Sequence, residues 1–164
     1  RFAELLRGNL DAVLLETPVL LPVELKHVQN YLELEKIRLH EEIRTTYQID
    51  RNTFWIPALT LQLSAERILW ALRQRRFARL TLQISTAEMD GCYLVMLAGD
   101  GSGQRAADAE QAEMAAEMLD GVRERLKNMC GGSLTMQEKE TGEVGIRIIL
   151  PKNTGQSALQ EWTG

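Results

Sequence analysis

The amino-acid sequence predicts an α+β fold, a two-layer α/β sandwich in which helices cover one face of a mixed, mostly antiparallel sheet, preceded by a helical arm. The first observation is the order of periodicities, which runs helix, helix, strand, helix, strand, strand, helix, strand, strand. The second is a composition of 45% hydrophobic and 26% charged residues, typical of a globular domain with a packed core. The third is the length of 164 residues, which suits one domain plus an arm.

The arm is predicted from two helical patterns at the start of the sequence. Residues 2–14 carry apolar side chains at intervals of three and four, and Pro18 and Pro22 are predicted to form the turn that follows. A second helix is predicted from Pro22 to Glu42, with an apolar stripe made of Leu25, Val28, Leu32 and Leu39. The stripe needs a partner surface. We expect it to pair with a preceding helix and a second protomer, or to pack back on the sheet.

The central segments predict a helix between strands. Residues 43–49 alternate as a half-buried strand does, and a helix is predicted over residues 58–74. Residues 80–84 and 93–97 are predicted to pair as antiparallel strands around the turn Met89-Asp90-Gly91.

A glycine-rich stretch separates these strands from the next predicted helix. Gly99 to Gly103 is predicted to be a loop, and the helix is predicted from Ala106 to Met129. Gly131-Gly132 closes this helix, because glycine tolerates left-handed backbone geometry.

The last segments predict a hairpin and a tail. Residues 134–138 and 146–150 are predicted to be strands joined around Thr141-Gly142. Residues 152–164 form a polar tail, which is expected to fray unless its apolar residues dock, namely Ala158, Leu159 and Trp162.

Charge, cysteine and hydropathy patterns exclude several classes of protein. The formal charge of −4 is too small to indicate a polyanionic partner. The one basic cluster, over residues 73–79, is more typical of a helix C-terminus than of a nucleic-acid surface. Cys92 and Cys130 form neither a disulfide framework nor a zinc motif, which favours a reducing cytosolic compartment. No apolar run approaches the ~20 residues of a membrane helix.

Three segments resemble one family of signalling enzymes. Residues 21–39, LPVELKHVQNYLELEKIRL, are similar to the helix before the ATP-binding (GHKL-type) module of bacterial sensor histidine kinases that partner LytTR-class response regulators, the LytS/YehU-like type. Residues 56–62 resemble the start of the family's nucleotide-binding helix, and residues 122–126 followed by Gly131-Gly132 resemble the helix after its ATP lid. The resemblance covers residues 1–151.

The resemblance implies a division of the chain and a biological setting. It implies an ATPase-like sandwich over residues 43–151, a helical arm over residues 1–42 that ends a dimerisation helix and connects it to the sandwich, and a polar tail over residues 152–164. It also implies a bacterial two-component system, a homodimer in the full-length protein, and a LytTR-type response regulator as partner, with no nucleic acid. A cytoplasmic fragment of a membrane-anchored sensor is the expected location.

The same resemblance places a candidate site on the predicted helix over residues 58–74. The family has Glu-Asn there, and the Asn is a Mg²⁺ ligand; Glu66 stands at the catalytic Glu and Arg67 stands at the Asn. Mg²⁺ requires oxygen ligands, whereas a guanidinium offers only donors and a permanent positive charge. Two positive centres ~4 Å apart repel by ~4 kcal/mol at an effective dielectric constant of about 20. We therefore predict no metal at this site.

The family's next motif is Asp-Asn-Gly-x-Gly, whose Asp binds the adenine amine. Aligned on Gly101 and Gly103, the motif has Gly99 at the Asp and Asp100 at the Asn. A slip of one residue would restore the carboxylate, so this loss depends on the register of the chain.

The phosphate end of the family's site differs as well. Ala116 and Met118 stand at the lid glycines whose backbone reaches the phosphates, and Glu143-Val144 replaces a Gly-Thr before the last strand. Because alanine gains ~1 kcal/mol of helix propensity over glycine, the lid is predicted to be a rigid acidic helix that repels phosphate.

These departures predict a degenerate nucleotide pocket. The preferred function is a pseudokinase-like signal-transduction module that keeps the fold, needs no ATP or Mg²⁺ as cofactor and acts by protein-protein contact. The alternative is the catalytic ATP-binding domain of an active sensor histidine kinase, which phosphorylates a histidine and passes the phosphoryl group to a response regulator, with Arg67 contacting the phosphates. A third function, nucleic-acid binding, would use the basic cluster. His27 and His40 do not match the family's phosphoacceptor motif and are expected to be surface residues.

Overall fold

A computed structural model describes residues 17–50, 53–106 and 118–163 of the chain. The helix predicted over residues 2–14 lies outside the described residues. So do residues 107–117, the first part of the helix predicted from Ala106, which include the lid position Ala116.

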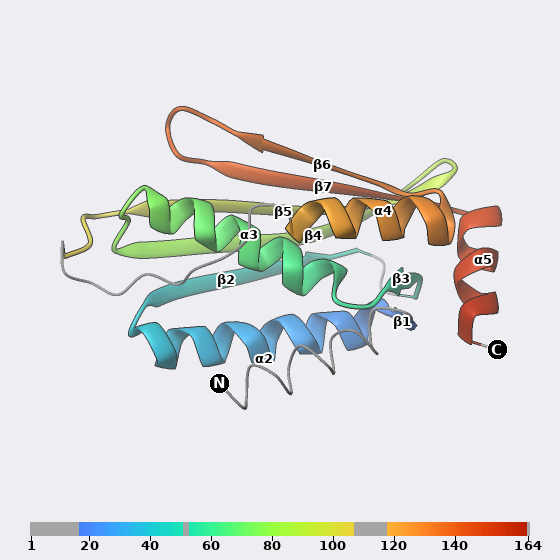
Figure 1. Cartoon of the computed structure of the whole chain (residues 1–164), viewed down its shortest axis with the longest axis horizontal. Coiled ribbons are helices and arrows are strands. Elements are labelled where there is room, and N and C mark those ends of the chain that lie inside the picture. The colour runs from blue at the N-terminus through green and yellow to red at the C-terminus, as the bar shows by residue number, and fades with distance from the viewer. Residues whose placement is uncertain (1–16, 51–52, 107–117, 164) are drawn as a thin grey trace.

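A five-stranded sheet forms one layer of the molecule (Figure 1). In spatial order its strands are β2 (Glu42–Ile49), β4 (Arg79–Met89), β5 (Cys92–Ser102), β7 (Val144–Pro151) and β6 (Ser133–Glu138). β2 pairs with β4 in parallel, and the other neighbours are antiparallel. Both predicted hairpins are confirmed, because Met89 pairs with Cys92 across the first turn and Glu138 pairs with Val144 across the second.

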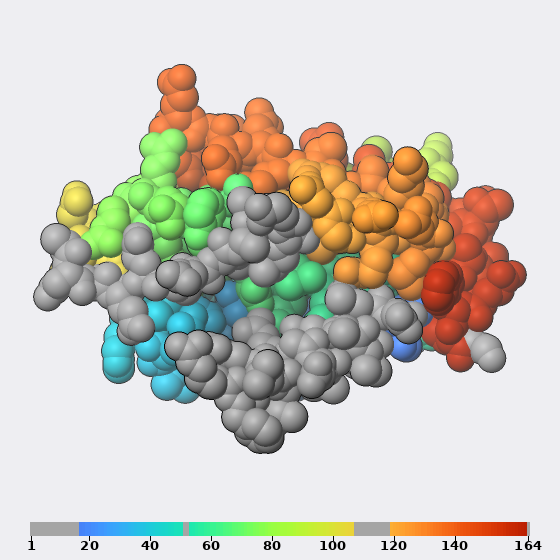
Figure 2. Space-filling model, viewed as in Figure 1, coloured from blue at the N-terminus to red at the C-terminus, as the bar shows by residue number. Residues whose placement is uncertain are grey.

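Among the described residues, three helices form the second layer on one face of this sheet. They are α2 (Leu21–Leu39), α3 (Thr60–Gln74) and α4 (Met118–Cys130). A fourth helix, α5 (Thr154–Thr163), packs against the end of α4, as Figure 2 shows. The predicted α+β sandwich is therefore confirmed.

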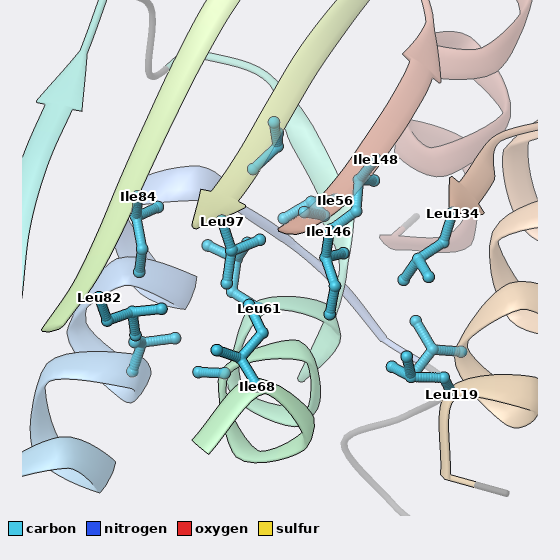
Figure 3. Close-up of a cluster of buried hydrophobic side chains, with 14 of the residues drawn as sticks. Ile56, Leu61, Ile68, Leu82, Ile84, Leu97, Leu119, Leu134, Ile146 and Ile148 are labelled. Atoms are coloured by element: carbon cyan, nitrogen blue, oxygen red, sulfur yellow. The ribbon is translucent and has the colours of Figure 1, made fainter. Parts of the chain in front are cut away.

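The core lies between the two layers. Alternation along β4 buries Leu80, Leu82 and Ile84, and their neighbours in sequence face the other side of the sheet. Figure 3 shows part of this cluster, in which Leu61 and Ile68 of α3 face the strands.

The predicted stripe of α2 finds its partner inside the chain. Val28, Leu32 and Leu39 are buried, and α2 packs against α3 and β2. Of the two expectations for this stripe, packing back on the sandwich is the one observed. The helix also ends three residues before the predicted Glu42, because His40 adopts a left-handed φ of 50° and β2 begins at Glu42.

The carboxylate of Glu24 joins α2 to the start of α3. It is fully buried, and its two oxygens accept hydrogen bonds from the backbone N–H groups of Leu59 (2.6 Å) and Leu61 (2.9 Å). These N–H groups are at the helix N-terminus, where they have no partner within the helix. A side chain of one helix thus caps the next and sets the position of the α3 residues that follow.

Two sequence predictions about loops are wrong. Pro18–Leu20, expected to lie in a turn, is strand β1, which pairs with β3 (Trp55–Pro57) in a separate two-stranded sheet. For the tail, docking is the expectation that the structure bears out, because α5 buries Leu159 fully, whereas Trp162 is exposed. The glycine stretch up to Ser102 belongs to β5 rather than to a loop, because it is hydrogen-bonded along its length to β4.

Candidate functional site

The candidate site includes Glu66 and Arg67, which are consecutive residues of α3. The guanidinium of Arg67 stacks over the Trp70 ring, with its central carbon 4.9 Å from the ring centroid. Its Nη1 lies 3.7 Å from Oε1 of Glu138 on β6. Arg67 therefore bridges α3 and the sheet.

Glu66 is only 7% exposed and is not a solvated helix residue. Its Oε1 accepts a hydrogen bond from Gln62 Nε2 one turn earlier, at 3.4 Å. The carboxylate is held on α3 by this contact. The residue that follows Glu66 is Arg67, whose side chain is a guanidinium and not an amide.

The inner faces of Gly99 and Gly101 are covered by packed side chains. A Cβ atom built at Gly99 would lie 2.2 Å from Cγ2 of Ile68 and 3.2 Å from Leu72 Cδ1. A Cβ atom at Gly101 would lie 2.3 Å from the ring of Phe77. Both glycines thus allow close approach of α3 and Phe77 to β5, and no phosphate-binding loop is formed here.

Phe77 also closes the far end of the same region. Its ring lies 2.9 Å from the Cβ position of Gly142, in the turn between β6 and β7. One aromatic ring therefore fills the space between the end of β5 and the β6–β7 turn. Phe77 falls within the predicted basic cluster over residues 73–79, and no sequence signal there marked its packing role; Gly101 on β5 and Gly142 in the β6–β7 turn leave the space for its ring.

Asp100 faces away from α3. Residues alternate along β5, so its side chain projects from the exposed face of the sheet, where Oδ1 accepts a hydrogen bond from the Gly101 N–H at 2.8 Å. The register that would return this carboxylate to the helix side is not adopted. Gly103 follows the strand with a φ of +74°, and its Cβ position lies 2.9 Å from Arg79 Nη2.

The β6–β7 hairpin has an ion pair of its own at the edge of the site. Glu143 makes an ion pair with Lys139 at 3.1 Å, and Val144 is buried. Between this hairpin and α3 lies a cavity of about 290 Å³, bordered by Trp70, Ala71, Gln74, Arg75, Glu138, Lys139, Gly142 and Val144. Its walls therefore mix positive and negative groups.

The predicted basic cluster is not one surface. Arg73 is buried and donates to Glu35 at 3.0 Å and to Glu41 at 2.6 Å. Arg105, in the segment after β5, reaches the same Glu41 at 2.5 Å, and Arg38 pairs with Glu35 at 2.8 Å. These five residues form a charge network that ties the ends of α2 and α3 to the segment after β5.

The two histidines differ in environment. His40 is exposed at the end of α2. His27 is partly buried, with Nδ1 3.8 Å from Oε1 of Glu24. Its interaction with the Glu24 carboxylate raises the pKa of the imidazole above the ordinary 6.5, outweighing partial burial, which lowers the pKa.

Across the described ranges, no group of three or more His, Cys, Asp and Glu side chains could hold a metal ion. No helix of the described part is long and apolar enough to cross a bilayer. Met118, the second predicted lid position, is the first residue of α4.

Comparison with solved structures identifies the fold. The chain is similar to a mycobacterial sensor histidine kinase, MprB (TM-score 0.55, 16% identity, 82% of this chain and 97% of that one). It is similar to the histidine kinase AdeS of Acinetobacter baumannii (0.54, 13%, 84% and 68%) and to the nucleotide-free catalytic domain of the histidine kinase ThkA (0.52, 15%, 83% and 96%). No protein-family profile and no curated protein matches the sequence. The chain therefore has the histidine-kinase ATPase fold.

A further structural neighbour contains a partner. It is ThkA in complex with the response regulator TrrA, with a TM-score of 0.56 and 14% identity over 84% of this chain and 42% of that one.

Proposed function

We propose that this chain is a signal-transduction module of a two-component sensor kinase, of the type that partners LytTR-class regulators, in which the ATPase fold is kept and the nucleotide site is degenerate. It works by contact with other proteins and requires neither ATP nor Mg²⁺. The fold supports the first part, and the sequence of α2 supports the LytTR type. The packing at Gly99 and Gly101 and the contacts of Arg67 support the second part.

One observation carries the degenerate reading: the inner faces of Gly99 and Gly101 are filled by Ile68, Leu72 and Phe77. A purine needs an open apolar slot and a carboxylate at its edge. Packed side chains occupy the slot, and the nearest carboxylate on β5, that of Asp100, lies on the opposite face of the sheet.

The metal position leads to the same proposal. Arg67 fills it with a cation that is already engaged with Trp70 and lies close to Glu138, and a guanidinium cannot ligate Mg²⁺. The donor set does not fit the metal, so no reaction step is assigned to it here. By analogy with the ThkA complex, the proposed partner is a response regulator.

Titration calorimetry with ATP, in the presence and absence of Mg²⁺, tests the proposal. We expect no binding heat up to ~1 mM nucleotide, a free energy weaker than about −4 kcal/mol. Arg67→Asn alone is expected to leave this unchanged, because Gly99 and Gly101 stay covered. Micromolar binding that requires Mg²⁺ would overturn the proposal in favour of the active kinase. Metal-independent binding that is lost in Arg67→Gln would favour the form of that kinase in which Arg67 holds the phosphates.

Contact with a partner is tested separately. A LytTR-type response regulator is expected to bind the full chain equally well with and without ATP, as measured by fluorescence anisotropy. Binding that appears only with Mg²⁺ and ATP would contradict the proposed mode of action.

A further inference from the structure

Leu59, the residue before α3, has a backbone conformation that leucine rarely adopts. Its φ of 66° and ψ of 5° lie in the left-handed region, and its side chain is buried. Among the described residues, three other non-glycine residues have a positive φ, and none of them is buried, namely His40, Arg76 and Asn153. A left-handed conformation is unfavourable for a residue with a Cβ atom and persists only where the surroundings enforce it.

Leu59 also lacks a side chain that could cap α3. The residue at this position of a helix is commonly Ser, Thr, Asp or Asn, whose side-chain oxygen accepts a hydrogen bond from a free N–H group. Leu59 makes no such bond. The local sequence therefore favours neither this backbone conformation nor this helix start, and contacts from other elements must supply both.

Glu24, in the first turn of α2, supplies one of these contacts. Its Oε1 accepts from the Leu59 N–H at 2.6 Å and its Oε2 from the Leu61 N–H at 2.9 Å. The carboxylate is fully buried, and a carboxylate that accepts hydrogen bonds away from water binds its donors strongly. The two bonds hold the backbone between the donors in its left-handed turn.

Arg125, on α4, contacts the other end of the same peptide group. Its Nη2 donates to the carbonyl of Ala58 at 3.1 Å, and this carbonyl belongs to the peptide whose N–H is that of Leu59. Burial lowers the pKa of the Arg125 guanidinium, and the charge of Glu24 partly offsets this effect. The Ala58–Leu59 peptide is thus held by α2 through its N–H and by α4 through its carbonyl.

We propose that the Ala58–Leu59 peptide group is a two-state element that couples the position of α2 to that of α3. With Glu24 against α3, the peptide keeps the orientation described here. When α2 moves away, the N–H loses its acceptor, the peptide rotates by half a turn, and Leu59 relaxes to a negative φ. The first turn of α3, with Leu61, then shifts against the sheet. This coupling goes beyond the proposed function, because it is the same whether or not the chain binds nucleotide.

A second buried carboxylate joins the other ends of the same two helices. Oε2 of Glu35 on α2 accepts from Nη2 of Arg73 on α3 at 3.0 Å. The helices therefore lie side by side and run in the same direction (Figure 1). Glu35 provides a matched control, because its contact with α3 lies at the opposite end of that helix from the Ala58–Leu59 peptide.

Substitutions at Leu59 measure the backbone conformation. Leu59→Gly and Leu59→Ala remove the same buried side chain apart from the Cβ atom, so their difference in urea unfolding reports the preference for a left-handed φ. With Glu24 present, the Gly variant is expected to have a folding equilibrium constant about fivefold or more above that of the Ala variant. With Glu24→Gln added, the Ala variant should equal or exceed the Gly variant, because a negative φ favours alanine. With Glu35→Gln added instead, the fivefold ratio should persist.

Hydrogen exchange on the wild-type chain tests the same claim if the combined variants fail to fold. The N–H groups of Leu59 and Leu61 are expected to exchange about tenfold faster or more than that of Ile84 on the central strand β4, because rotation of one peptide needs no global unfolding.

Three results would overturn the proposal. One is a Gly-to-Ala ratio that Glu24→Gln leaves unchanged. The second is an equal loss of that ratio in Glu35→Gln, which would mean that any loosening of α2 from α3 has the same effect. The third is exchange of the Leu59 N–H only at the rate of Ile84, because the peptide would then have a single state.

Discussion

At the scale of single residues, two glycines allow the close packing of β5 against its neighbours. Gly99 and Gly101 face inward from β5, and the side chains opposite them come within 2.2 and 2.3 Å of a Cβ position. Neither glycine has a positive φ, so backbone freedom is not what they supply. They supply space, and α3 and Phe77 occupy it.

Gly99→Ala is therefore expected to destabilise the fold by about 1–3 kcal/mol, the usual effect of overpacking a core, as measured by urea unfolding. Gly145→Ala on β7 is the matched control, because the nearest atom to its Cβ position is 4.0 Å away, and it should be neutral or slightly stabilising. Adding Ile68→Ala should recover part of the Gly99→Ala loss in a double-mutant cycle. Equal effects at the two glycines would mean that the close packing is absent.

His27 gives the molecule a pH dependence with a defined sign. Glu24 raises the pKa of His27 in the folded state, so the folded chain binds the proton more tightly than the unfolded chain does. The stabilisation is fully present below the unfolded pKa of 6.5 and is lost as the pH rises through the folded pKa. The stability difference between wild type and His27→Gln is expected to be larger at about pH 5.5 than at about pH 8.5. A difference that grows with pH would contradict this assignment.

At the scale of elements, the buried charge network fixes the ends of α2 and α3. Glu41 accepts hydrogen bonds from Arg73 and Arg105, both largely buried, so removing its charge deprives two buried cations of a carboxylate partner, although Arg73 keeps its contact with Glu35. Glu41→Gln is expected to cost about 3–5 kcal/mol in urea unfolding, as for other broken buried pairs. Glu33→Gln, which breaks the exposed pair with Lys36, should cost under about 1 kcal/mol. Similar losses in both variants would show that the buried network contributes no more to the free energy of unfolding than an exposed ion pair does.

The elements also show where sequence patterns succeed. Alternation along residues 80–84 predicted the inward faces of β4, and the glycines after Met129 predicted the end of α4, where Gly131 has a φ of +70°. These signals are local. The buried role of Arg73 could not be predicted, because it depends on Glu35 and Glu41, more than thirty residues away.

The extent of β5 was missed for a related reason. Glycine has low strand propensity, so Gly99 to Gly103 is typical of a loop when it is considered alone. Pairing with Leu80 and Leu82 and the approach of α3 override that preference. The same tertiary contacts identify Phe77, which nothing in its neighbouring sequence marks.

At the scale of the whole molecule, the chain has the histidine-kinase ATPase fold, and side chains of α3 and Phe77 pack against the inner face of β5. Sequence analysis predicted the sandwich, and the comparisons confirm the fold. It also placed Arg67 at the metal position by resemblance, and the degeneracy of the pocket stays a proposal. The contacts of Arg67 with Trp70 and Glu138 could not be predicted from the sequence, because the second depends on the position of α3 relative to β6.

Nuclear magnetic resonance on the full chain, titrated with ATP and Mg²⁺, tests the central claim most directly. The reporters are the backbone amides of Gly99 and Gly101, the methyl groups of Ile68 and the indole N–H of Trp70. We predict that none of these signals shifts in a saturable way up to ~1 mM nucleotide. Saturable, magnesium-dependent shifts of the two glycine amides and the Ile68 methyl groups would contradict the account, because they would mean that the packed side chains give way to adenine.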